Sequence, residues 1–341
     1  MFFIREIVNS SMKIAVVGAT GLVGREMLKV LAERDLGPFL LIPVASPKST
    51  GMILHFKEKE YKVITHEQAI GQKPEIAVFS AGAAASREWA PAYAAAGVTV
   101  IDNSSAWRMN DEVPLVVPEI NGNVLTRNQK IISNPNCSTI GIVAALAPLH
   151  RKYRIKRIVI STYQSVTGTG FKAVKQLENE RKGIDGEKAY PHPIDLNLFP
   201  HGGDFLPGGY TTEEVKLVNE TRKILAEPTL RITGTVVRVP VIGGHSASVN
   251  VEFETGVNPD QARELLSQTP GIVVQDEPAK NIYPMPLYAQ GKDEVFVGRI
   301  RKDESNPNTL NLFIVTDNLR KGAATNAIQI AQYLIAHDLL N

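Results

Sequence analysis

The feature that most constrains this chain is a glycine-rich turn that directly follows a short β-branched segment near its N-terminus. Residues 14–17, Ile-Ala-Val-Val, are predicted to form a buried strand, and a helical pattern extends from the turn to about residue 34. Between them stand Gly18, Gly21 and Gly24. Glycines in such a turn let the backbone approach a pyrophosphate, which the free amides at the helix N-terminus then bind. A tight turn in an unrelated α/β protein has similar glycines, but strand, turn and helix together favour a dinucleotide site.

The segment after this turn alternates between strand and helix patterns, which indicates a parallel sheet covered by helices on both faces. Further strands are predicted at 39–44, 75–79, 98–101 and 130–132, and an alanine-rich helix at 83–96. We therefore expect an α/β fold whose N-terminal part is a Rossmann-like dinucleotide-binding domain over residues 12–136. The segment 1–11 before Met12 is predicted to be an extension, or the result of an upstream start codon.

The sequence beyond about residue 151 has longer strands with more alternation, which is typical of a mostly antiparallel sheet with one open face. The predicted strands are 155–163, 230–241, 246–255, 294–300 and 309–316, and the predicted helices are 171–182, 212–226 and 259–268. Residues 183–210 are predicted to be a long surface loop. Together these form a second, α+β domain over 137–319. The final stretch, Arg320 to Leu340, is predicted to be one long helix, and residues 320–341 to complete the first domain.

Composition excludes several classes of function. The 341 residues suffice for two domains, and 37 basic against 35 acidic side chains leave a formal net charge of +2. No basic excess indicates nucleic acid or an anionic membrane as a partner, and the longest apolar run, 138–149, is shorter than the about 20 residues that span a bilayer. A single cysteine excludes an internal disulfide and a cysteine-rich zinc site. We expect a soluble, cytoplasmic protein without a metal centre.

The residues after the second predicted strand indicate which dinucleotide is bound. An NAD site usually has Asp or Glu there to bind the ribose hydroxyls, whereas this chain has Ser46, Lys48 and Ser49. Hydroxyl groups and a cation without a carboxylate suit the 2′-phosphate of NADP. A solvated turn has the same composition, and lysine selects a phosphate less strongly than a bidentate arginine does. NADP is the favoured cofactor.

The only cysteine, Cys137, lies between Asn136 and Ser138, where an apolar helical run begins. Because Pro135 breaks the preceding element, Cys137 is predicted at a helix N-terminus, where the helix dipole and free amides stabilise a thiolate. A lone cysteine is more often a small buried apolar residue than a nucleophile. Its polar neighbours and its place at the helix start favour the nucleophile.

Seven short motifs occur in an order that is specific to one enzyme family. They are GATGLVG at 18–24, SSAWR at 104–108, NPNCST at 134–139, TYQSV at 162–166, RVPV at 238–241, GGHS at 243–246 and DNLRKGAA at 317–324. With these motifs, the chain from Met12 to its end resembles the aspartate-β-semialdehyde dehydrogenases. The resemblance implies NADPH-dependent reductive dephosphorylation of β-aspartyl phosphate to aspartate β-semialdehyde, in the biosynthesis of lysine, threonine, methionine and diaminopimelate.

The resemblance also implies catalytic roles. Cys137 is expected to form a thioacyl intermediate, which a hydride reduces because a thioester remains an electrophilic carbonyl. His245 is expected to be the general acid and base, since an imidazole titrates near neutrality; without the resemblance, none of the seven histidines stands out. Gln164 is expected to orient the substrate, although its position equally fits an ordinary polar residue of a strand.

Four residues are expected from the resemblance to bind the substrate, and a fifth, Asn136, is a candidate because it stands next to Cys137. Arg238 is expected to clamp its α-carboxylate through two hydrogen bonds, and Glu213 to bind its amino group. Lys216 and Arg108 are expected to bind its phosphate, and Asn136 to donate to the oxyanion. The residues by themselves leave other interpretations open. A buried Arg238 requires either an internal carboxylate or a ligand, Glu213 and Lys216 are spaced for a surface ion pair, and Arg108 fits a solvated loop charge.

The same resemblance assigns cofactor contacts to the glycine turn and to residues elsewhere. These are Gly18, Thr20, Gly21, Leu22, Val23, Gly24, Ser46, Lys48, Ser49, Gly168 and Asn318. Asn318 is expected to face the nicotinamide amide, or else to be the N-cap of the last helix. The family often has arginine at the position of Lys48, so this departure weakens the selection of NADP over NAD.

Two other functions are compatible with parts of the pattern. N-acetyl-γ-glutamyl-phosphate reductase shares the fold, the cofactor and the thioacyl chemistry. It usually has glycine before its cysteine and an aromatic residue after it, which Asn136 and Ser138 do not match. Its acetylated substrate also has no cation for Glu213. The third function, a non-catalytic NADP-binding protein, does not require the cysteine, histidine, glutamine and two arginines that occur together here.

Assembly is predicted from the second domain. Its strands are expected to have apolar residues on both faces, for instance Val236, Val237, Val239, Val249 and Val251. Such a surplus indicates a second buried surface. Twofold symmetry is the commonest way to bury one, and the resembling family forms dimers through this domain. We expect a homodimer, with a tetramer as a larger assembly; the alternative is a monomer whose second face is covered by the loop at 183–210.

Overall fold

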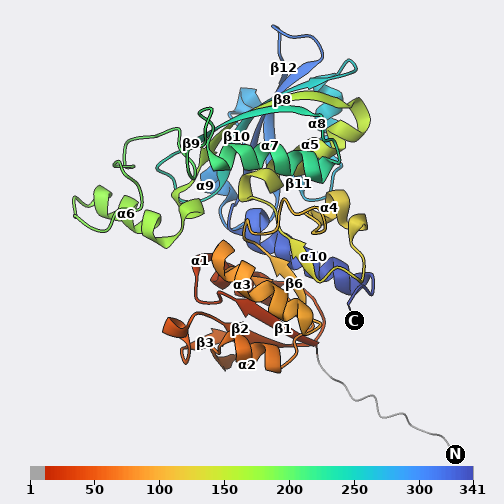
Figure 1. The fold of residues 1–341 in the computed structure, drawn as a ribbon. Helices are drawn as coiled ribbons and strands as arrows, with labels where there is room; N and C mark the ends of the chain where they lie inside the picture. The colour runs from red at the N-terminus through yellow and green to blue at the C-terminus, as the bar shows by residue number, and fades with distance from the viewer. Residues whose placement is uncertain (1–11, 341) are drawn as a thin grey trace, which may run out of the picture.

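The computed structural model describes residues 12–340 and contains a parallel and a mixed β-sheet, each with its own hydrophobic core (Figure 1). The extension predicted at 1–11, and Asn341 at the end of the chain, lie outside the described residues. The parallel sheet is drawn in red to yellow and the mixed sheet in green to blue, and the last helix returns to the first sheet. The predicted α/β fold with two different sheets is confirmed.

The first sheet has the strand order β2-β1-β5-β6-β7, and every neighbouring pair is parallel. Its strands are β1 (Met12–Val17), β2 (Phe39–Val44), β5 (Ile76–Phe79), β6 (Thr99–Asp102) and β7 (Ile131–Ser133), and its helices are α1 (Leu22–Glu33), α2 (His66–Gly71), α3 (Gly82–Ala95) and α10 (Thr325–Ala336). Along β1, Ile14 and Val16 face α1 and α10. Ala15 and Val17 face α2 and α3, because successive side chains of a strand point to opposite faces.

The second sheet has the strand order β11-β12-β13-β10-β8-β9. Its strands are β8 (Ile155–Gln164), β9 (Arg231–Arg238), β10 (His245–Phe253), β11 (Ile272–Val274), β12 (Val295–Lys302) and β13 (Thr309–Thr316), and the helices on one face are α5 (Cys137–Tyr153), α7 (Thr212–Leu225) and α8 (Pro259–Ser267). The three central pairings are antiparallel and the two outer ones are parallel. The predicted mostly antiparallel sheet is confirmed.

The other face of this sheet is less apolar than the sequence analysis predicts. Val249 and Val251 of β10, with Val236 of β9, are buried against the helices. Ser248 and Asn250 of β10 point to the opposite face, because side chains alternate along a strand. The expectation of apolar residues on both faces is therefore wrong for β10.

Residues 183–210 form the predicted long loop without a helix or a named strand, but part of this loop is packed. It follows α6 (Phe171–Arg181), and the two form the green projection at one side of the molecule (Figure 1). Tyr190, Ile194 and Phe199 are buried there and pack with the apolar face of α6 into a small separate core. Periodicity does not detect such packing, because these apolar residues follow neither the helical nor the strand spacing.

Several short elements were not predicted. They are β3 (Ile53–Phe56), β4 (Lys59–Lys62), α2, α4 (Pro118–Asn121), β11 and α9 (Pro286–Ala289). Segments of three to six residues contain too few repeats of either period to be recognised. Of the helices in the part of the chain that is described, none combines the length and the apolar character needed to cross a membrane.

The predicted terminal helix is present from Arg320 to Ala336, but its first turn is not α-helical and it ends before Leu340. Arg320–Ala324 form a π-helical turn, and α10 follows it and ends at Ala336. Asp317 holds the start of the turn, because its carboxylate accepts the backbone N–H groups of Leu319 and Arg320. A π-turn has the same polar and apolar pattern as an α-helix over one turn, which is why the sequence does not reveal it.

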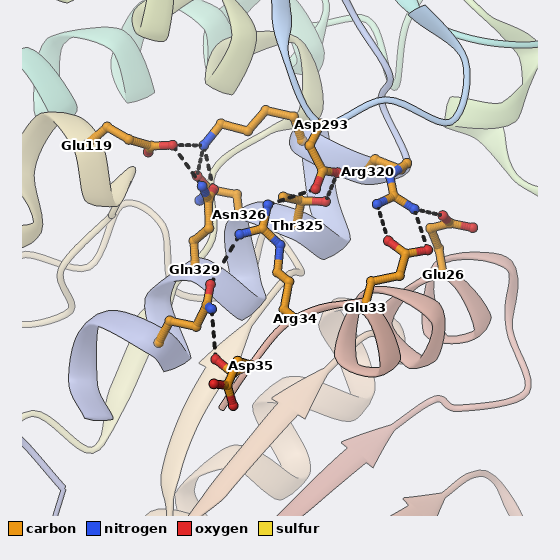
Figure 2. A network of polar contacts seen from close by, with 12 residues as sticks. Glu26, Glu33, Arg34, Asp35, Glu119, Asp293, Arg320, Thr325, Asn326 and Gln329 are labelled. Carbon is orange, nitrogen blue, oxygen red and sulfur yellow. Dashed lines mark hydrogen bonds and ion pairs between the residues drawn. The ribbon is translucent and has the colours of Figure 1, made fainter. Parts of the chain in front are cut away.

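A network of charged side chains, in which Arg320 and Lys321 are buried, joins this π-helical turn to both domains (Figure 2). Arg320 donates to Glu26 and Glu33 of α1 and to Asp293, which precedes β12 of the second sheet. Lys321 extends the network by donating to Glu119. Because α1 begins at the glycine turn, these contacts fix the dinucleotide-binding region relative to the second domain.

Asp293 connects three donors in this network. Its carboxylate accepts from Nε of Arg320 at 2.8 Å, from Nη2 of Arg34 at 2.7 Å and from Oγ1 of Thr325 at 2.6 Å. Burial alone raises the pKa of the Asp293 carboxyl group, but these donors outweigh burial and hold the pKa below its ordinary value.

Replacing Asp293 with asparagine is expected to lower the thermal midpoint at pH 7, at a cost of about 2 kcal/mol, because three donors lose a charged acceptor. The lowered folded-state pKa means that the carboxylate stabilises the protein above the unfolded-state pKa of about 4. That contribution is lost as the pH falls through the folded-state pKa. Scanning calorimetry should therefore show a difference between the native protein and D293N that shrinks towards pH 3.

Asp260→Asn is the control for this prediction. Asp260 also pairs with an arginine, Arg263, at 2.6 Å, but its side chain is exposed, so its loss should leave the midpoint almost unchanged. Equal midpoints for D293N and the native protein at pH 7 would contradict the stabilising role of the network.

Candidate active site

The two domains meet at a cleft that contains a cavity of about 360 Å³. Its walls come from the starts of α1, α3 and α5, the loops after β6 and β8, α7, and the π-helical turn. The predicted site residues that line it are Val23, Arg108, Asn136, Cys137, Gly168, Glu213, Lys216 and Asn318. Residues 12–340 contain no group of three or more His, Cys, Asp or Glu side chains that could hold a metal ion. The cavity thus brings together predicted residues from segments far apart in the sequence.

Cys137 is the first residue of α5, at the helix start where the sequence predicts it, and Asn136 is the N-cap. The side-chain oxygen of Asn136 accepts the N–H groups of Ser138 and Thr139 at 2.9 and 3.4 Å. Because the cap uses this oxygen, only the NH₂ group of Asn136 remains to donate to an oxyanion in the cleft. Cys137 as a whole residue is partly exposed and lines the cavity.

Burial opposes ionisation of the Cys137 thiol. It raises the pKa of the thiol to about 11, and the carboxylate of Glu213 adds to the rise. The charges of Arg238 and Arg108 and the N–H of Ser138 lower the pKa by less. Desolvation thus acts against the thiolate that the helix N-terminus is predicted to stabilise, and the thiolate stays a prediction.

His245 is the first residue of β10 and lies buried beside the start of α5. It lines a small cavity together with Cys137. Its Nδ1 accepts the backbone N–H of Ser165 at 3.1 Å. On the other side of the ring stands Gly168, where a Cβ atom would lie 2.8 Å from Nε2 and 3.1 Å from Nη1 of Arg238. Glycine at this position therefore keeps His245 and Arg238 next to the cleft.

The contact with Ser165 fixes the tautomer of the His245 ring. Because Nδ1 accepts a hydrogen bond, the neutral ring carries its proton on Nε2. Burial, with a smaller effect of the Arg238 charge, lowers the pKa of His245 well below its ordinary value. At neutral pH the ring is an uncharged donor at Nε2. It takes up a proton only at Nδ1, after the Ser165 contact is broken.

Hydrogen bonds connect the end of β8 with the segments around it. Gln164 donates from Nε2 to the hydroxyl of Ser138 at 3.0 Å, and its buried Oε1 has no partner among residues 12–340. Thr167 donates to the side-chain oxygen of Asn318 at 3.0 Å. Asn318 is thus not the N-cap of the last helical segment; Asp317 accepts the N–H groups there instead.

Arg238 and Glu213 face each other at the edge of the cavity. Nη2 of Arg238 lies 3.6 Å from the carboxylate of Glu213, and Nη1 donates to the backbone oxygen of Ser165 at 2.9 Å. The buried Nε of Arg238 has no partner within the described chain. Glu213 therefore pairs with Arg238 and not with Lys216 in a surface ion pair. Lys216 lines the cavity one helical turn away.

Arg108 is buried and is not a solvated loop charge. Its Nε and Nη2 donate to the backbone oxygens of Asn134 and Asn103, each at 3.0 Å. Its Nη1 donates at 3.0 Å to Glu220 of α7, which is fully buried. The guanidinium is therefore held on three sides and still lines the cavity.

Two further residues of the site, Glu220 and Gly322, are not among the predicted ones. Glu220 lies seven positions after Glu213 and four after Lys216, so all three share one face of α7, and this spacing is the signal that could have found it. Gly322 lies in the π-helical turn, where a Cβ atom would be 3.2 Å from Cβ of Cys137. Its only signal is its place in the motif at 317–324.

The glycine turn fits the pyrophosphate of a dinucleotide. Gly18 has a φ of +83°, and a Cβ atom there would lie 2.4 Å from the backbone oxygen of Ser80. At Gly24 a Cβ atom would lie 2.0 Å from the backbone oxygen of Gly18. Gly21 is the N-cap of α1, and no side chain of the described residues caps the helix there. The amides of the first turn, which begins with Leu22, are therefore open to an anion.

The predicted 2′-phosphate residues lie next to this turn. Ser46, Lys48 and Ser49 are in and around the short 3₁₀ turn that follows β2. The hydroxyl of Ser49 is 3.5 Å from that of Thr20 in the glycine turn, and the Lys48 side chain is exposed. The structure thus brings both sets of predicted dinucleotide residues together at the carboxyl ends of β1 and β2, where such sheets bind their ligands.

Two family matches cover most of the chain. Residues 13–127 match the family described as Semialdehyde dehydrogenase, NAD binding domain, and residues 146–321 match the family described as Semialdehyde dehydrogenase, dimerisation domain. The fold and the site thus define a semialdehyde dehydrogenase, an oxidoreductase with an NAD(P)-binding domain.

Individual relatives narrow this class. The aspartate-semialdehyde dehydrogenase of Aquifex aeolicus is 50% identical over 96% of this chain and 99% of that protein, and that of Legionella pneumophila is 46% identical over 96% and 97%. Aspartate semialdehyde dehydrogenase II from Vibrio cholerae, solved by itself and complexed with ASA, is 41% identical with a TM-score of 0.91, over 96% of this chain and 99% and 98% of those chains. The chain belongs to the aspartate-semialdehyde dehydrogenase family.

The raised thiol pKa gives a direct test in the protein without substrate. Because Cys137 is the only cysteine, alkylation by iodoacetamide reports on it alone. With a pKa of about 11, the rate should rise about tenfold per pH unit from pH 7 to pH 10, since only the thiolate reacts. The rate is followed by mass spectrometry, with Cys137→Ser as the blank. A plateau below pH 8.5 would show that the helix N-terminus outweighs burial.

Proposed function

We propose that this protein catalyses the NADPH-dependent reductive dephosphorylation of β-aspartyl phosphate to aspartate β-semialdehyde. The observation that carries the proposal is the cavity in which the Cys137 thiol shares walls with Arg108, Lys216 and Glu213. A substrate with a phosphate on one side of its acyl carbon and an ammonium group on the other requires cations and a carboxylate around one nucleophile. Arg108 and Lys216 supply the cations, and Glu213 supplies the carboxylate. The relatives are named for the semialdehyde, and one that is 41% identical was solved complexed with ASA.

We propose NADP as the cofactor. The residues that support this choice are Ser46, Lys48 and Ser49, which offer two hydroxyls and a cation at the end of β2 where an NAD site has a carboxylate. The glycine turn and the open amides of α1 are expected to hold the pyrophosphate, and Asn318 and Gly168 the nicotinamide side. When bound, NADPH supplies the hydride that reduces the acyl carbon.

Cys137 is the proposed nucleophile. The thiol proton passes to His245 and the sulfur attacks the acyl carbon, so that a C–S bond forms, the bond to the phosphate oxygen breaks and phosphate leaves. The NH₂ group of Asn136 is placed to donate to the carbonyl oxygen as it becomes an oxyanion. After reduction, the C–S bond breaks, the aldehyde leaves and the thiol is restored.

His245 and Gln164 are the other proposed catalytic groups. The Nε2–H of His245 can donate to the carbonyl oxygen directly, because the Ser165 contact already sets that tautomer. Uptake of the thiol proton by His245 first requires that Nδ1 lose its contact with Ser165. Donation from Nε2–H requires no such change, so the ring is set up to donate before it is set up to accept. Gln164 is fixed to Ser138 at the start of α5, so that its carboxamide is held next to the nucleophile.

Charged pairs at the cavity edge are the proposed substrate clamp. Nε of Arg238 has no partner among the described residues, and Nη2 has only a loose 3.6 Å contact to Glu213. These two nitrogens are therefore left to donate to the α-carboxylate of the substrate. Glu213 then exchanges its partner for the ammonium group of the substrate. Lys216 and Arg108 are proposed to bind the phosphate.

We also propose that the protein is a cytoplasmic homodimer, and that a domain boundary lies at 136–137, with residues 320–341 part of the first domain. Support for the dimer comes from the match of residues 146–321 to a dimerisation domain. Tyr163 and Phe313, with ring centroids 6.3 Å apart, lie on the sheet face opposite α5. A cytoplasmic location suits an enzyme that needs its thiol reduced.

Turnover in the reverse direction tests the proposed reaction. Given aspartate semialdehyde and inorganic phosphate, the protein should reduce NADP, measured by the absorbance of the reduced cofactor. Cys137→Ser should lose activity but still bind NADPH, because a serine hydroxyl without an activating base is a poor nucleophile. N-acetyl-glutamate semialdehyde should support little turnover; a preference for it would favour N-acetyl-γ-glutamyl-phosphate reductase.

The choice of cofactor is tested at Lys48. Lys48→Ala should raise the KM for NADP about tenfold, the equivalent of about 1.4 kcal/mol, and leave the KM for NAD unchanged, because only NADP carries the 2′-phosphate. Lys59→Ala is the matched control, since Lys59 is an exposed lysine in the hairpin that packs beside β2. Equal effects on both cofactors would reject the proposed contact.

A further inference from the structure

Glu220 of α7 is a buried carboxylate that none of the proposed roles uses. Its side chain is fully buried. Oε1 accepts from Nη1 of Arg108 at 3.0 Å, and Oε2 accepts the backbone N–H of Asn136 at 2.6 Å. A single side chain therefore touches both the arginine at the cavity wall and the residue directly before Cys137.

The hydrogen bonds of Arg108 leave it a defined face for an anion. A guanidinium group has five N–H donors. One on each nitrogen is used, by Asn134, Glu220 and Asn103. Two donors remain, and Arg108 lines the cavity. Without Glu220, Nη1 has no charged partner, and the orientation of the group is no longer fixed on the side of α7.

The contact with Asn136 fixes the start of the helix that bears the nucleophile. The side chain of Asn136 caps α5 by accepting the N–H of Ser138, and its own N–H is bound by Glu220. The N-cap residue is thus held through both its backbone and its side chain. Cys137, the next residue, is positioned by the same contacts.

A second residue of α7 supports the loop that carries Arg108. Nζ of Lys223 donates to three backbone oxygens within residues 108–113, at 2.7 to 2.9 Å. Lys223 lies three positions after Glu220 and ten after Glu213, on the same face as Lys216. One face of α7 therefore supplies Glu213 and Lys216 to the cavity. The same face supplies Glu220 and Lys223, which support the cavity wall.

We infer that Glu220 is a positioning residue that holds the anion-binding face of Arg108 and the helix start at Cys137 in one fixed arrangement. The ligand chemistry that this arrangement suits is an acyl phosphate, with the phosphate on Arg108 while the acyl carbon is at Cys137. In assigning the anion as phosphate, this inference rests on the proposed function. Glu220 also pairs with Arg108, whose charge lowers the pKa of the Cys137 thiol.

Protection of Cys137 from iodoacetamide by inorganic phosphate tests this inference without any turnover. Phosphate bound at Arg108 should slow alkylation of the native protein. In Glu220→Gln one carboxamide oxygen must serve both Arg108 and the backbone N–H of Asn136. The phosphate concentration that gives half protection should therefore rise about tenfold. The uncompensated Arg108 charge in this variant should also shift the pH profile of alkylation to lower pH.

Glu220→Asp separates the charge from the position. Aspartate keeps the negative charge but is one methylene shorter, so it cannot reach both Arg108 and Asn136. The pH profile of alkylation should stay native, while the phosphate concentration for half protection rises as in E220Q. A native phosphate response in both variants would overturn the inference, as would an unshifted pH profile in E220Q.

Asp276→Asn is the matched control for a merely structural effect. Asp276 is a buried carboxylate that binds Arg263 at 2.7 Å and accepts the backbone N–H groups of Arg299 and Ile300. None of these residues lines the cavity. Asp276→Asn should lower the thermal midpoint without changing phosphate protection or the pH profile. A change equal to that of E220Q would show that Glu220 is only structural.

The outcome is distinguishable from a failure of the proposed function. If the native protein shows phosphate protection that E220Q weakens, but no phosphate-dependent reduction of NADP, then the positioning role stands and the proposed reaction fails. If the native protein reduces NADP in the presence of phosphate, but E220Q retains the native phosphate protection and the native KM for phosphate, then the proposed reaction stands and the positioning role fails. In the turnover assay, the expected result is a raised KM for phosphate and an unchanged KM for NADP.

Discussion

The position of Cys137 in the cleft depends on the three-residue connection between β7 and α5, residues 134–136. Asn134 is fully buried, and its side chain donates to Asn103 and accepts from Asn326 of α10. Asn136 is held by Glu220 and caps α5. Polar groups buried this deeply are costly unless every donor and acceptor is matched, so the connection has a single satisfactory geometry. Because it joins the parallel sheet to the helix of the second sheet, that geometry places Cys137 at the boundary between them.

Two pairs of oppositely charged residues lie around this connection. Arg108 with Glu220 and Arg238 with Glu213 are buried ion pairs, which contribute little to stability once desolvation is counted. Their value lies in placing donors at defined positions in the cavity. The tight pair, at 3.0 Å, orients an arginine that keeps two donors, and the loose pair, at 3.6 Å, leaves both partners able to exchange for a ligand.

The thiol and the imidazole show how burial determines reactivity. Desolvation raises the pKa of the Cys137 thiol to about 11 and lowers the pKa of His245, so burial disfavours the charged form of both groups. The closeness of Glu213 adds to the first effect and that of Arg238 to the second. A ligand cation that pairs with Glu213 would remove one of the contributions that raise the pKa of the thiol.

The sequence by itself determined the glycine turn, the parallel sheet, the start of α5 at Cys137 and the family, because each is written in local periodicity, in residues required by backbone geometry or in short ordered motifs. It also indicated Glu213, Lys216, Arg238 and His245, but only through a resemblance. Tertiary structure alone decided the burial of Arg108, its partner Glu220, the tautomer of His245 and the burial that raises the pKa of the Cys137 thiol. The π-helical turn at Arg320–Ala324 was likewise invisible. These features depend on contacts between residues up to 112 positions apart, as between Arg108 and Glu220, and on desolvation, which no local pattern of residues records.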